Sequence, residues 1–502
     1  MCRARWLRAL ALLALLSGMG LSHAAEDVLR IGSKRFTESY ILAEVLAQTA
    51  APHTSTPPVV QRGLGNTAIV YEALRAGSID LYAEYTGTIA REILKSDKPM
   101  TREAMNAALA PLGLGIAVPF GFNDGYALAM RADRADSLGI ASLADLAKHP
   151  GLRLGLSNEF IGRADGWKGL AARYRLPQSP VGLDHGLAYD AIGARQVDVI
   201  DIYTTDAKID SLGLRVLKDD GQYFPRYDAV LLYRLDVPLR FAQAWAAMQR
   251  LEGRINEQTM VAMNARAELQ GEGFEAIARD FLAGGTAGMA AMAQRGFTAK
   301  LFGPDLARLT RQHLVLVGAA VGLALLFAVP LAILVFPHVR LRAAVLGLAG
   351  LLQTVPSLAL LAMLISLMGA IGTLPALIAL TLYALLPIMR NTVTGLSEVP
   401  QGLCQAATAL GMTKGQALWL VQLPLALPTV LAGVRTATTI AIGTATIAAF
   451  IGAGGYGERI VTGLALNDRA LLMAGALPAA ALALVSEAVF EAIERIMRRR
   501  HG

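Results

Sequence analysis

The chain has 502 residues, of which 54% are hydrophobic and 17% are charged, with a formal net charge of +7. A single soluble core stops growing near about 250–300 residues, so a chain of this length is expected to divide into domains. Charged residues are spread through residues 27–311, whereas residues 314–490 consist largely of Leu, Ala, Val, Ile and Gly. This change in composition excludes a disordered, collagen-like or coiled-coil chain and predicts a soluble part followed by a membrane part.

The cysteines and the basic charge limit the kinds of site that the chain could carry. Cys2 and Cys404 leave residues 26–311 without a cysteine, so neither a disulfide framework nor a thiolate metal site is expected there. We expect no metal and no cofactor. The densest basic run, residues 495–500, directly follows an apolar span, which is typical of a cytoplasmic flank in contact with membrane lipid. Nucleic acid is therefore not an expected partner.

The N-terminus has the pattern of a secretory signal. Arg3, Arg5 and Arg8 precede an apolar run over residues 9–16, and small residues stand before a cut after Ala24. We predict that residues 1–25 are a signal peptide, with an uncleaved anchor helix as the alternative. Both interpretations put residue 26 and those after it outside the cytoplasm.

In the soluble part, short apolar runs alternate with helical patterns. Strands are expected at residues 28–32, near 80–82, and at 152–155, 197–203 and 214–217, with a helix at 38–49. Strands separated by helices predict α/β layers. The glycine-rich run 63–68 is expected to be a turn and a helix N-terminus, since no acidic ribose partner follows it. No nucleophile elbow, zinc-binding His–Glu motif or EF-hand loop occurs, so we do not expect an enzyme.

The membrane part is expected to be an all-α transmembrane domain over residues 314–502, joined by a linker at 301–313. Five apolar spans are expected, at 314–336, 345–368, 374–389, 427–451 and 471–490. If the soluble part is outside, the first span runs inward and places Arg340, Arg342, Arg390 and Lys414 inside. This distribution agrees with the positive-inside rule.

Residues 398–424, between the third and fourth spans, mix polar and apolar side chains. Gly411 interrupts this segment and Pro424 ends it, which predicts a helix–Gly–helix hairpin on the cytoplasmic face; a plain connecting loop is the alternative. The succession Gln405-Ala406-Ala407, Gly411 and Pro424 resembles the EAA loop of ABC-importer permeases, with Gln405 where the family usually has Glu. The resemblance implies that this loop docks onto an ATP-binding subunit. No P-loop motif occurs in the chain, so ATP hydrolysis is expected in that separate subunit.

Several of the 13 tyrosines stand in turn-like, polar surroundings: Tyr85, Tyr126, Tyr203 and Tyr227. A tyrosine at a strand end that faces a cleft offers its π-face to a cation. The alternative for any one of them is a tyrosine at the surface or the edge of the core.

These tyrosine runs, together with residues 32–38 and 163–167, resemble the soluble receptors of ABC importers for glycine betaine, carnitine and choline. The resemblance covers roughly residues 28–300 and implies two α/β lobes that close on a ligand, the second at about 127–225. It implies that the tyrosine set surrounds a trimethylammonium group near the backbone carbonyl of Asp124. It also implies that Lys34, Thr88 and Arg163 hold the ligand carboxylate. The alternatives are a structural salt bridge for Arg163 and a solvated turn residue for Lys34.

General chemistry supports assigning these roles to the residues of this chain. A quaternary ammonium has no N–H to donate, so π-faces can select it where hydrogen bonds cannot, and a carboxylate requires fixed donors. We therefore predict a substrate-binding domain at residues 26–300, in the periplasm, fused to a multi-pass inner-membrane permease that pairs as a homodimer. Its function would be ATP-driven import of quaternary amines such as glycine betaine. The alternatives are import of another betaine such as ergothioneine, and a membrane-tethered sensor that does not transport.

Overall fold

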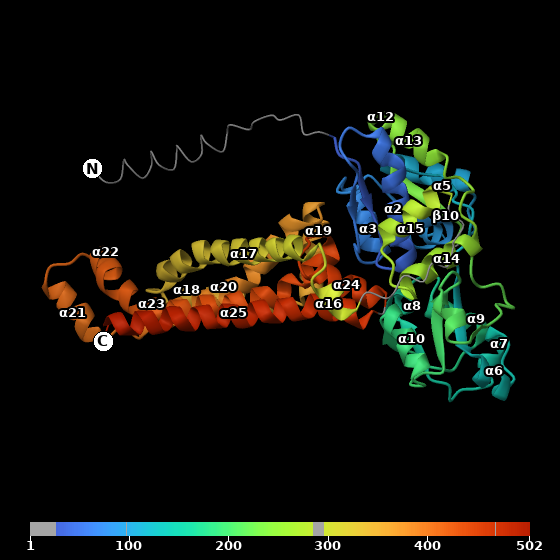
Figure 1. Cartoon of the computed structure of the whole chain (residues 1–502). Helices are drawn as coiled ribbons and strands as arrows, with labels where there is room; N and C mark the ends of the chain where they lie inside the picture. Colours follow the sequence, from blue (N-terminus) through green and yellow to red (C-terminus); the bar gives the residue numbers. More distant parts are fainter. Residues whose placement is uncertain (1–26, 97, 285–295, 467, 502) are drawn as a thin grey trace.

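The computed structural model describes residues 27–96, 98–284, 296–466 and 468–501. It has a rounded α/β body at one end of a long bundle of helices (Figure 1). The predicted signal peptide lies outside the described residues.

The α/β body contains two five-stranded sheets, each the centre of one lobe. The first has the order β2-β1-β3-β10-β4, in which β10 is antiparallel to its neighbours β3 and β4. Its strands are β1 (Arg30–Gly32), β2 (Val59–Gln61), β3 (Leu81–Tyr85), β4 (Leu114–Ala117) and β10 (Ala229–Arg234). The sequence predicted β1 and β3, whereas β4 and β10 were not predicted.

The second sheet has the order β7-β6-β8-β5-β9. Its strands are β5 (Tyr126–Arg131), β6 (Leu154–Ser157), β7 (Val181–Leu183), β8 (Val199–Tyr203) and β9 (Leu214–Val216). Its helices are α6 (Ala132–Leu138), α7 (Leu143–Leu146), α8 (Asn158–Gly162), α9 (Trp167–Tyr174), α10 (His185–Gly193) and α11 (Lys208–Ser211). Strands that alternate with helices give the expected α/β layers in both lobes.

Two crossing segments connect the lobes. The chain leaves the first sheet after β4, returns to it at β10, and pairs the two crossings through a bridge between Asn123 and Asp228. Phe120 also donates its backbone N–H to Ala229, at 2.9 Å. Because both crossings run side by side between the sheets, residues at their ends face both lobes at once.

The helices of the first lobe are built around α2 (Thr37–Ala50), which is buried on nearly all sides. A helix that is apolar around most of its circumference belongs in a core, and α2 packs against α13, α14 and α15. These and the remaining elements of this lobe are η1 (Ala51–His53), α3 (Thr67–Arg75), α4 (Thr86–Thr88), η2 (Ile89–Ile93), α5 (Arg102–Leu109), η3 (Ala110–Leu112), α12 (Val237–Arg240), α13 (Ala242–Gln249), α14 (Glu257–Glu268) and α15 (Phe274–Leu282).

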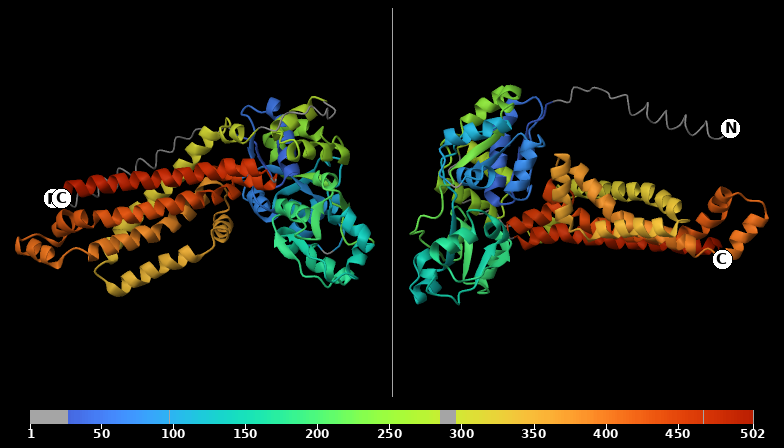
Figure 2. Two further views of the ribbon diagram at one scale, coloured as in Figure 1. Left: turned by 60° about the horizontal axis from the view of Figure 1, so that its bottom comes forward. Right: turned by 180° about the vertical axis from the view of Figure 1, so that it is seen from behind.

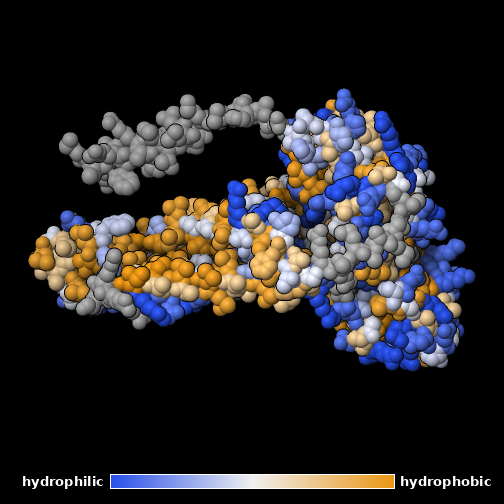
Figure 3. All heavy atoms as spheres, in the orientation of Figure 1, coloured by the Kyte–Doolittle hydropathy of each residue, from blue (hydrophilic) through white to orange (hydrophobic). Residues whose placement is uncertain are grey.

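The helical bundle has an apolar surface along its length, in contrast to the α/β body (Figure 3). Among the described residues, four helical stretches are long and apolar enough to cross a membrane: α17 (Leu306–Val335), α20 (Thr373–Ser397), Lys414–Ala445 and α25 (Arg469–Met497, within Arg469–His501). The pair α18 (Val339–Thr354) and α19 (Ser357–Met368) passes the same test together and is bent by 99°. This half of the chain is a membrane domain.

The structure adds detail to two of the expected segments. The predicted second span, 345–368, is broken at Val355-Pro356, because proline restricts the residue before it to extended backbone and lacks an N–H. The predicted linker, 301–313, is mostly helical, since α17 begins at Leu306 after the short helix α16 (Phe297–Leu301). Arg459 fixes this connection by bonding to Asp305 at 2.9 Å and to the carbonyl of Leu301 at 2.9 Å.

The predicted hairpin at 398–424 is formed by α21 (Gln401–Ala409) and α22 (Lys414–Ala417), which lie on either side of Gly411. Gly411 has a φ of +77°, a conformation that favours glycine. Figures 1 and 2 place this hairpin at the end of the bundle that is remote from the α/β body. At the end of this segment, helical structure continues from η4 (Leu418–Gln422) into α23 (Leu423–Ala445). Pro424 lies in the first turn of α23, where a missing N–H is tolerated.

Both lobes contact the membrane half at its other end, around η5 (Ile447–Ile451) and α24 (Gly457–Ala465). In the first lobe, the Arg35 guanidinium lies 5.0 Å from the centroid of the Phe450 ring. In the second lobe, Asp190 pairs with Arg469 at 3.2 Å, and Gly186 lies against the carbonyl of Leu464.

Candidate ligand-binding site

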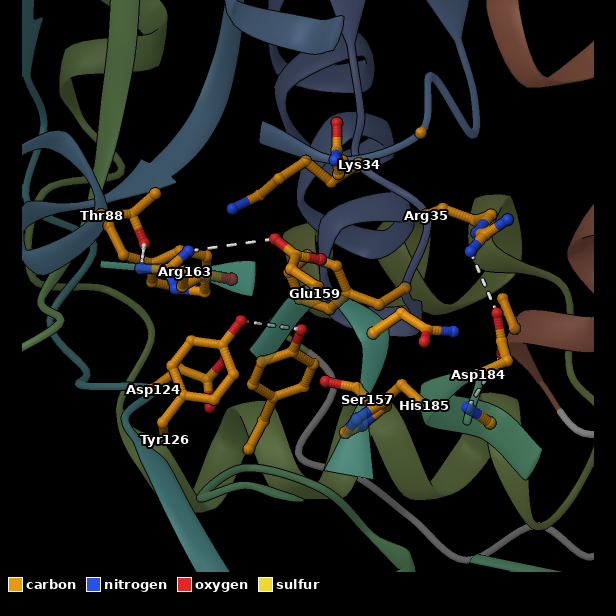
Figure 4. Close-up of a pocket in the computed structure, with 18 of the residues that line it drawn as sticks. Lys34, Arg35, Thr88, Asp124, Tyr126, Ser157, Glu159, Arg163, Asp184 and His185 are labelled. Carbon is orange, nitrogen blue, oxygen red and sulfur yellow. Dashed lines mark hydrogen bonds and ion pairs between the residues drawn. The ribbon is translucent and has the colours of Figure 1, made fainter. Parts of the chain in front are cut away.

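A cavity of about 110 Å³ lies between the two lobes. Its lining includes the whole set of ligand-binding residues that the sequence predicted: Lys34, Tyr85, Thr88, Asp124, Tyr126, Arg163, Tyr203 and Tyr227. Many of them are shown in Figure 4, where they converge from both lobes. The fold therefore brings together residues that are up to about 190 positions apart in the sequence.

The aromatic rings form a continuous wall. The centroid of the Tyr126 ring lies 5.1 Å from that of Tyr203 and 5.8 Å from that of Tyr227. Phe36 links Tyr203 to Tyr85, with centroid distances of 5.2 Å and 6.2 Å. Phe36 was not among the predicted site residues, although it stands within the run 32–38 that carried the resemblance.

The strands explain why these tyrosines meet. Tyr85 is the last residue of β3, Tyr203 is the last of β8 and Tyr126 is the first of β5, where it pairs with Tyr203 across the sheet. Tyr227 lies on the crossing that returns to β10. The rings of Tyr85, Tyr126 and Tyr203 are thus held at strand ends that face the other lobe, which is the usual place for ligand sites in α/β folds.

The phenol hydroxyl groups have partners inside the protein. Tyr85 donates to the buried carboxylate of Glu38, Tyr227 donates to Asp165 at 2.7 Å, and the hydroxyls of Tyr126 and Tyr203 lie 3.4 Å apart. Hydrogen bonds at the rim of a ring fix its orientation and leave its face available for another contact.

Lys34 is buried at the edge of this wall, so its interpretation as a solvated turn residue was wrong. Its ammonium donates to Glu84 at 2.5 Å and lies 4.7 Å from the centroid of the Tyr85 ring. Among the described residues, the second oxygen of Glu84 has no hydrogen-bond partner. A buried lysine with one carboxylate partner keeps N–H donors available on the cavity side.

Arg163 connects the two lobes. It forms a salt bridge with Asp165 at 2.7 Å, and it lies 3.3 Å from the hydroxyl of Thr88 in the first lobe (Figure 4). Its guanidinium also lies 4.9 Å from the centroid of the Tyr126 ring. Arg163 therefore both forms a structural salt bridge and lines the cavity.

The turn before α10 contributes cavity residues that sequence reasoning did not select. Arg35 pairs with Asp184 across the cleft at 3.0 Å, and the His185 ring lies 4.4 Å from that of Tyr203 (Figure 4). Burial lowers the pKa of His185, but the neighbouring Asp206 carboxylate outweighs it and raises the pKa to about 9. In the sequence, the sign of these cavity residues was the pair Asp184-His185 at the N-terminus of α10. An Asp at a helix N-cap is more often structural than functional.

Comparison with protein families agrees with this arrangement. Residues 27–284 match the substrate-binding domain of the ABC-type glycine betaine transport system, and residues 320–501 match the inner membrane component of binding-protein-dependent transport systems. The chain belongs to the ABC-type glycine betaine transport family. It is a fusion of the substrate-binding and permease parts of a betaine- or osmoprotectant-type ABC importer, with homologues among glycine betaine, carnitine and choline transporter components.

Three relatives of this transport family show how the similarity is distributed. The osmoprotectant import permease OsmW of Salmonella typhimurium is 46% identical over 38% of this chain and 91% of its own length. The glycine-betaine-binding protein of Pseudomonas aeruginosa is 35% identical over 52% of this chain and 89% of its own length. The ergothioneine transport permease and binding protein EgtU of Helicobacter pylori is 32% identical over 51% of this chain, a match that spans 47% of that relative.

The contribution of the aromatic wall can be measured at Tyr85. We expect Tyr85→Ala to weaken binding of a quaternary ammonium by about 0.5–2 kcal/mol, the range for a cation over an aromatic ring. Tyr233→Ala provides a matched control, because Tyr233 lies on β10 and packs against Trp245 instead of lining the cavity. Titration calorimetry distinguishes the two variants, and equal losses would contradict the role of Tyr85.

Proposed function

We propose that this protein captures a quaternary amine such as glycine betaine in the interlobe cavity and delivers it to its own membrane domain for ATP-driven import. The observation that carries the proposal is the aromatic wall beside two buried cations, Lys34 and Arg163. A betaine has a cation at one end and a carboxylate at the other. Aromatic faces attract the first and charged donors bind the second.

The direct test is a ligand titration of the full-length chain in lipid nanodiscs. We expect glycine betaine and choline to bind and glycine, which offers an ammonium that water solvates well, to bind far more weakly. Absence of binding by every trimethylammonium compound would refute the proposal. Uptake into proteoliposomes with an ATP-binding subunit then tests transport, and uptake without ATP would refute the ATP-driven part.

Ergothioneine is the second candidate ligand, because the relative in Helicobacter pylori is named as its transporter and binding protein. It carries the same trimethylammonium and carboxylate groups with an added ring. Competition between the two ligands in the same titration ranks them.

For the membrane half, we propose that the α21–α22 hairpin docks onto the ATP-binding subunit. Gln405 and Ala406 are exposed on α21, whereas Ala407 is buried and holds the helix against its neighbours. The hairpin is remote from the α/β body, which is the position that a cytoplasmic contact requires if the body is periplasmic (Figure 1). The permease half would pair with a second copy to enclose a path. Co-purification of an ATP-binding subunit distinguishes this importer from a sensor that does not transport.

The hairpin turn gives a prediction at Gly411. No atom lies within 4 Å of a Cβ built there, so Gly411→Val introduces no clash and acts only through the φ of +77°. The left-handed conformation costs a residue with a side chain about 1–2 kcal/mol. We expect a severalfold loss of uptake with unchanged ligand affinity. Gly402→Val, at a helical and equally open position on α21, is the control; equal losses in both variants would contradict a role for the turn.

A further inference from the structure

A group of buried acids lies directly beside the aromatic wall. Glu38 is 1% exposed and Asp124 is 4% exposed. They come from different parts of the fold, since Glu38 is in the first turn of α2 and Asp124 lies on the crossing before β5. Both are linked to Thr205, which follows β8 in the second lobe.

The hydroxyl of Thr205 lies between the two carboxyl groups. Its oxygen is 2.6 Å from Oε2 of Glu38 and 2.9 Å from Oδ1 of Asp124. A hydroxyl carries a single hydrogen and can donate to only one of these oxygens at a time. The other oxygen then faces a lone pair of the hydroxyl, a contact that is favourable only if that carboxyl carries a proton.

The charges around Glu38 and Asp124 also favour a proton on one of these two carboxyl groups. Eight titratable or charged groups face this pair. They are Lys34 after β1, Glu84 and Tyr85 from β3, His185 and Tyr189 from α10, Asp206 and Lys208 after β8, and Glu268 from α14. Lys34 is paired with Glu84, and His185 is paired with Asp206. Lys208 is thus left as the one cation among these groups facing Glu38, Asp124 and Glu268, so negative charge is in excess if all three are ionised.

Burial, which outweighs the hydrogen bonds from Thr205 and Tyr85, raises the pKa of Glu38 to about 7. Burial, together with the nearby Glu38, also raises the pKa of Asp124. Geometry, charge balance and burial therefore all indicate that the pair of Glu38 and Asp124 retains a proton near neutral pH.

The position of this pair connects it with the ligand. Tyr85 donates to the other oxygen of Glu38, so the same carboxyl group fixes a ring of the wall. Asp124 lines the cavity itself. A cation within the wall would favour the ionised form of both acids, because opposite charges stabilise one another at short range in a buried site.

We propose that Glu38 and Asp124 share one proton through the hydroxyl of Thr205, and that a quaternary ammonium entering the aromatic wall displaces this proton. The proton leaves to the buffer, and the carboxylate that remains balances the charge of the bound cation. Glu38 is then a positioning residue that acts through Tyr85 and Thr205. The inference rests on the proposed function, since it requires a cationic ligand.

The linkage has a definite sign. Because the bound state holds fewer protons than the free state, affinity rises with pH, by up to about tenfold per pH unit for one released proton. The rise is expected over the pH range in which the free pair holds a proton that the bound pair has lost, and it ends once the free pair is also deprotonated.

Calorimetry of the full-length chain with choline, in buffers of different ionisation enthalpy, counts the released protons. We expect the release of up to one proton at pH 6, and none with the neutral analogue in which carbon replaces the choline nitrogen. Glu38→Gln should abolish the release, while Thr205→Ser, which keeps the bridging hydroxyl, should retain it. Glu44→Gln is the matched control, because Glu44 is buried on the same helix but pairs with Arg62 away from the cavity.

Several results would overturn the inference. These are choline binding without proton release, equal release with the neutral analogue, and release that persists in Glu38→Gln. The wild-type measurement stands even if a variant fails to fold. If no trimethylammonium compound binds at any pH, it is the proposed function that fails instead.

Discussion

Replacement of Arg163 by alanine is expected to weaken glycine betaine binding by at least roughly thirtyfold. Truncation of one partner in a buried, hydrogen-bonded charge pair costs about 2–5 kcal/mol. Arg163 is buried, and its loss removes both the donor to a ligand carboxylate and the cross-lobe contact with Thr88. Choline lacks the carboxylate, so its affinity should fall much less. Titration of both ligands against both proteins measures the difference.

Asp165, the salt-bridge partner of Arg163, complicates the interpretation of Arg163→Ala alone. Without Arg163, the buried Asp165 keeps only its hydrogen bond from Tyr227 as a side-chain partner among the described contacts, and an uncompensated charge would disturb that ring. The double variant Arg163→Ala with Asp165→Asn removes the charge and retains an acceptor for Tyr227. If the double variant binds choline and betaine with equal losses, Arg163 is structural and does not hold a carboxylate.

Replacement of Gly186 by alanine is expected to reduce ATP-driven uptake by at least about fivefold, a larger effect than on ligand affinity. A Cβ at Gly186 would lie 2.4 Å from the carbonyl oxygen of Leu464 in α24, so the second lobe could not keep its contact with the membrane half. Relief of such an overlap typically costs about 1–3 kcal/mol. Uptake by proteoliposomes that contain the ATP-binding subunit, beside calorimetry on the same protein, separates the two effects.

The matched control lies on the same helix. Gly193, also in α10, has a single atom at 4.0 Å from its Cβ position, and that atom belongs to Leu212 of the same lobe. Neither glycine has a positive φ, so alanine is compatible with the backbone at both positions and neither substitution should unfold the lobe. Normal uptake by Gly186→Ala, or an equal loss in Gly193→Ala, would show that this contact is not needed for transport.

The sequence predicted the α/β class and several strands because apolar runs such as 197–203 lie between clear helical patterns. It did not predict β10, since the apolar run at 229–234 follows a long irregular stretch and its partners, β3 and β4, are distant in the chain. The break at Pro356 was missed for a different reason. The apolar run continues through it, and composition alone does not distinguish a bent pair of helices from one straight span.

The cavity residues were predicted through a resemblance to known receptors, and the structure places them around one cavity. What the sequence could not provide is the set of partners that hold them. Glu38, Thr205 and Asp165 look like ordinary polar residues in the chain, and their proximity to the tyrosines depends on the packing of both lobes. Long-range contacts of this kind have no local pattern.

The short connection between the two halves, held by the bonds of Arg459 to Asp305 and Leu301, also determines how uptake responds to the number of receptors. A receptor that diffuses freely can outnumber its permease and can store bound ligand. Here each permease half has one receptor at a high local concentration, so their encounter does not depend on how much protein the cell makes. Uptake by such a fusion should increase in proportion to the number of fused chains. At a fixed number of chains, only the ligand concentration should determine when uptake saturates.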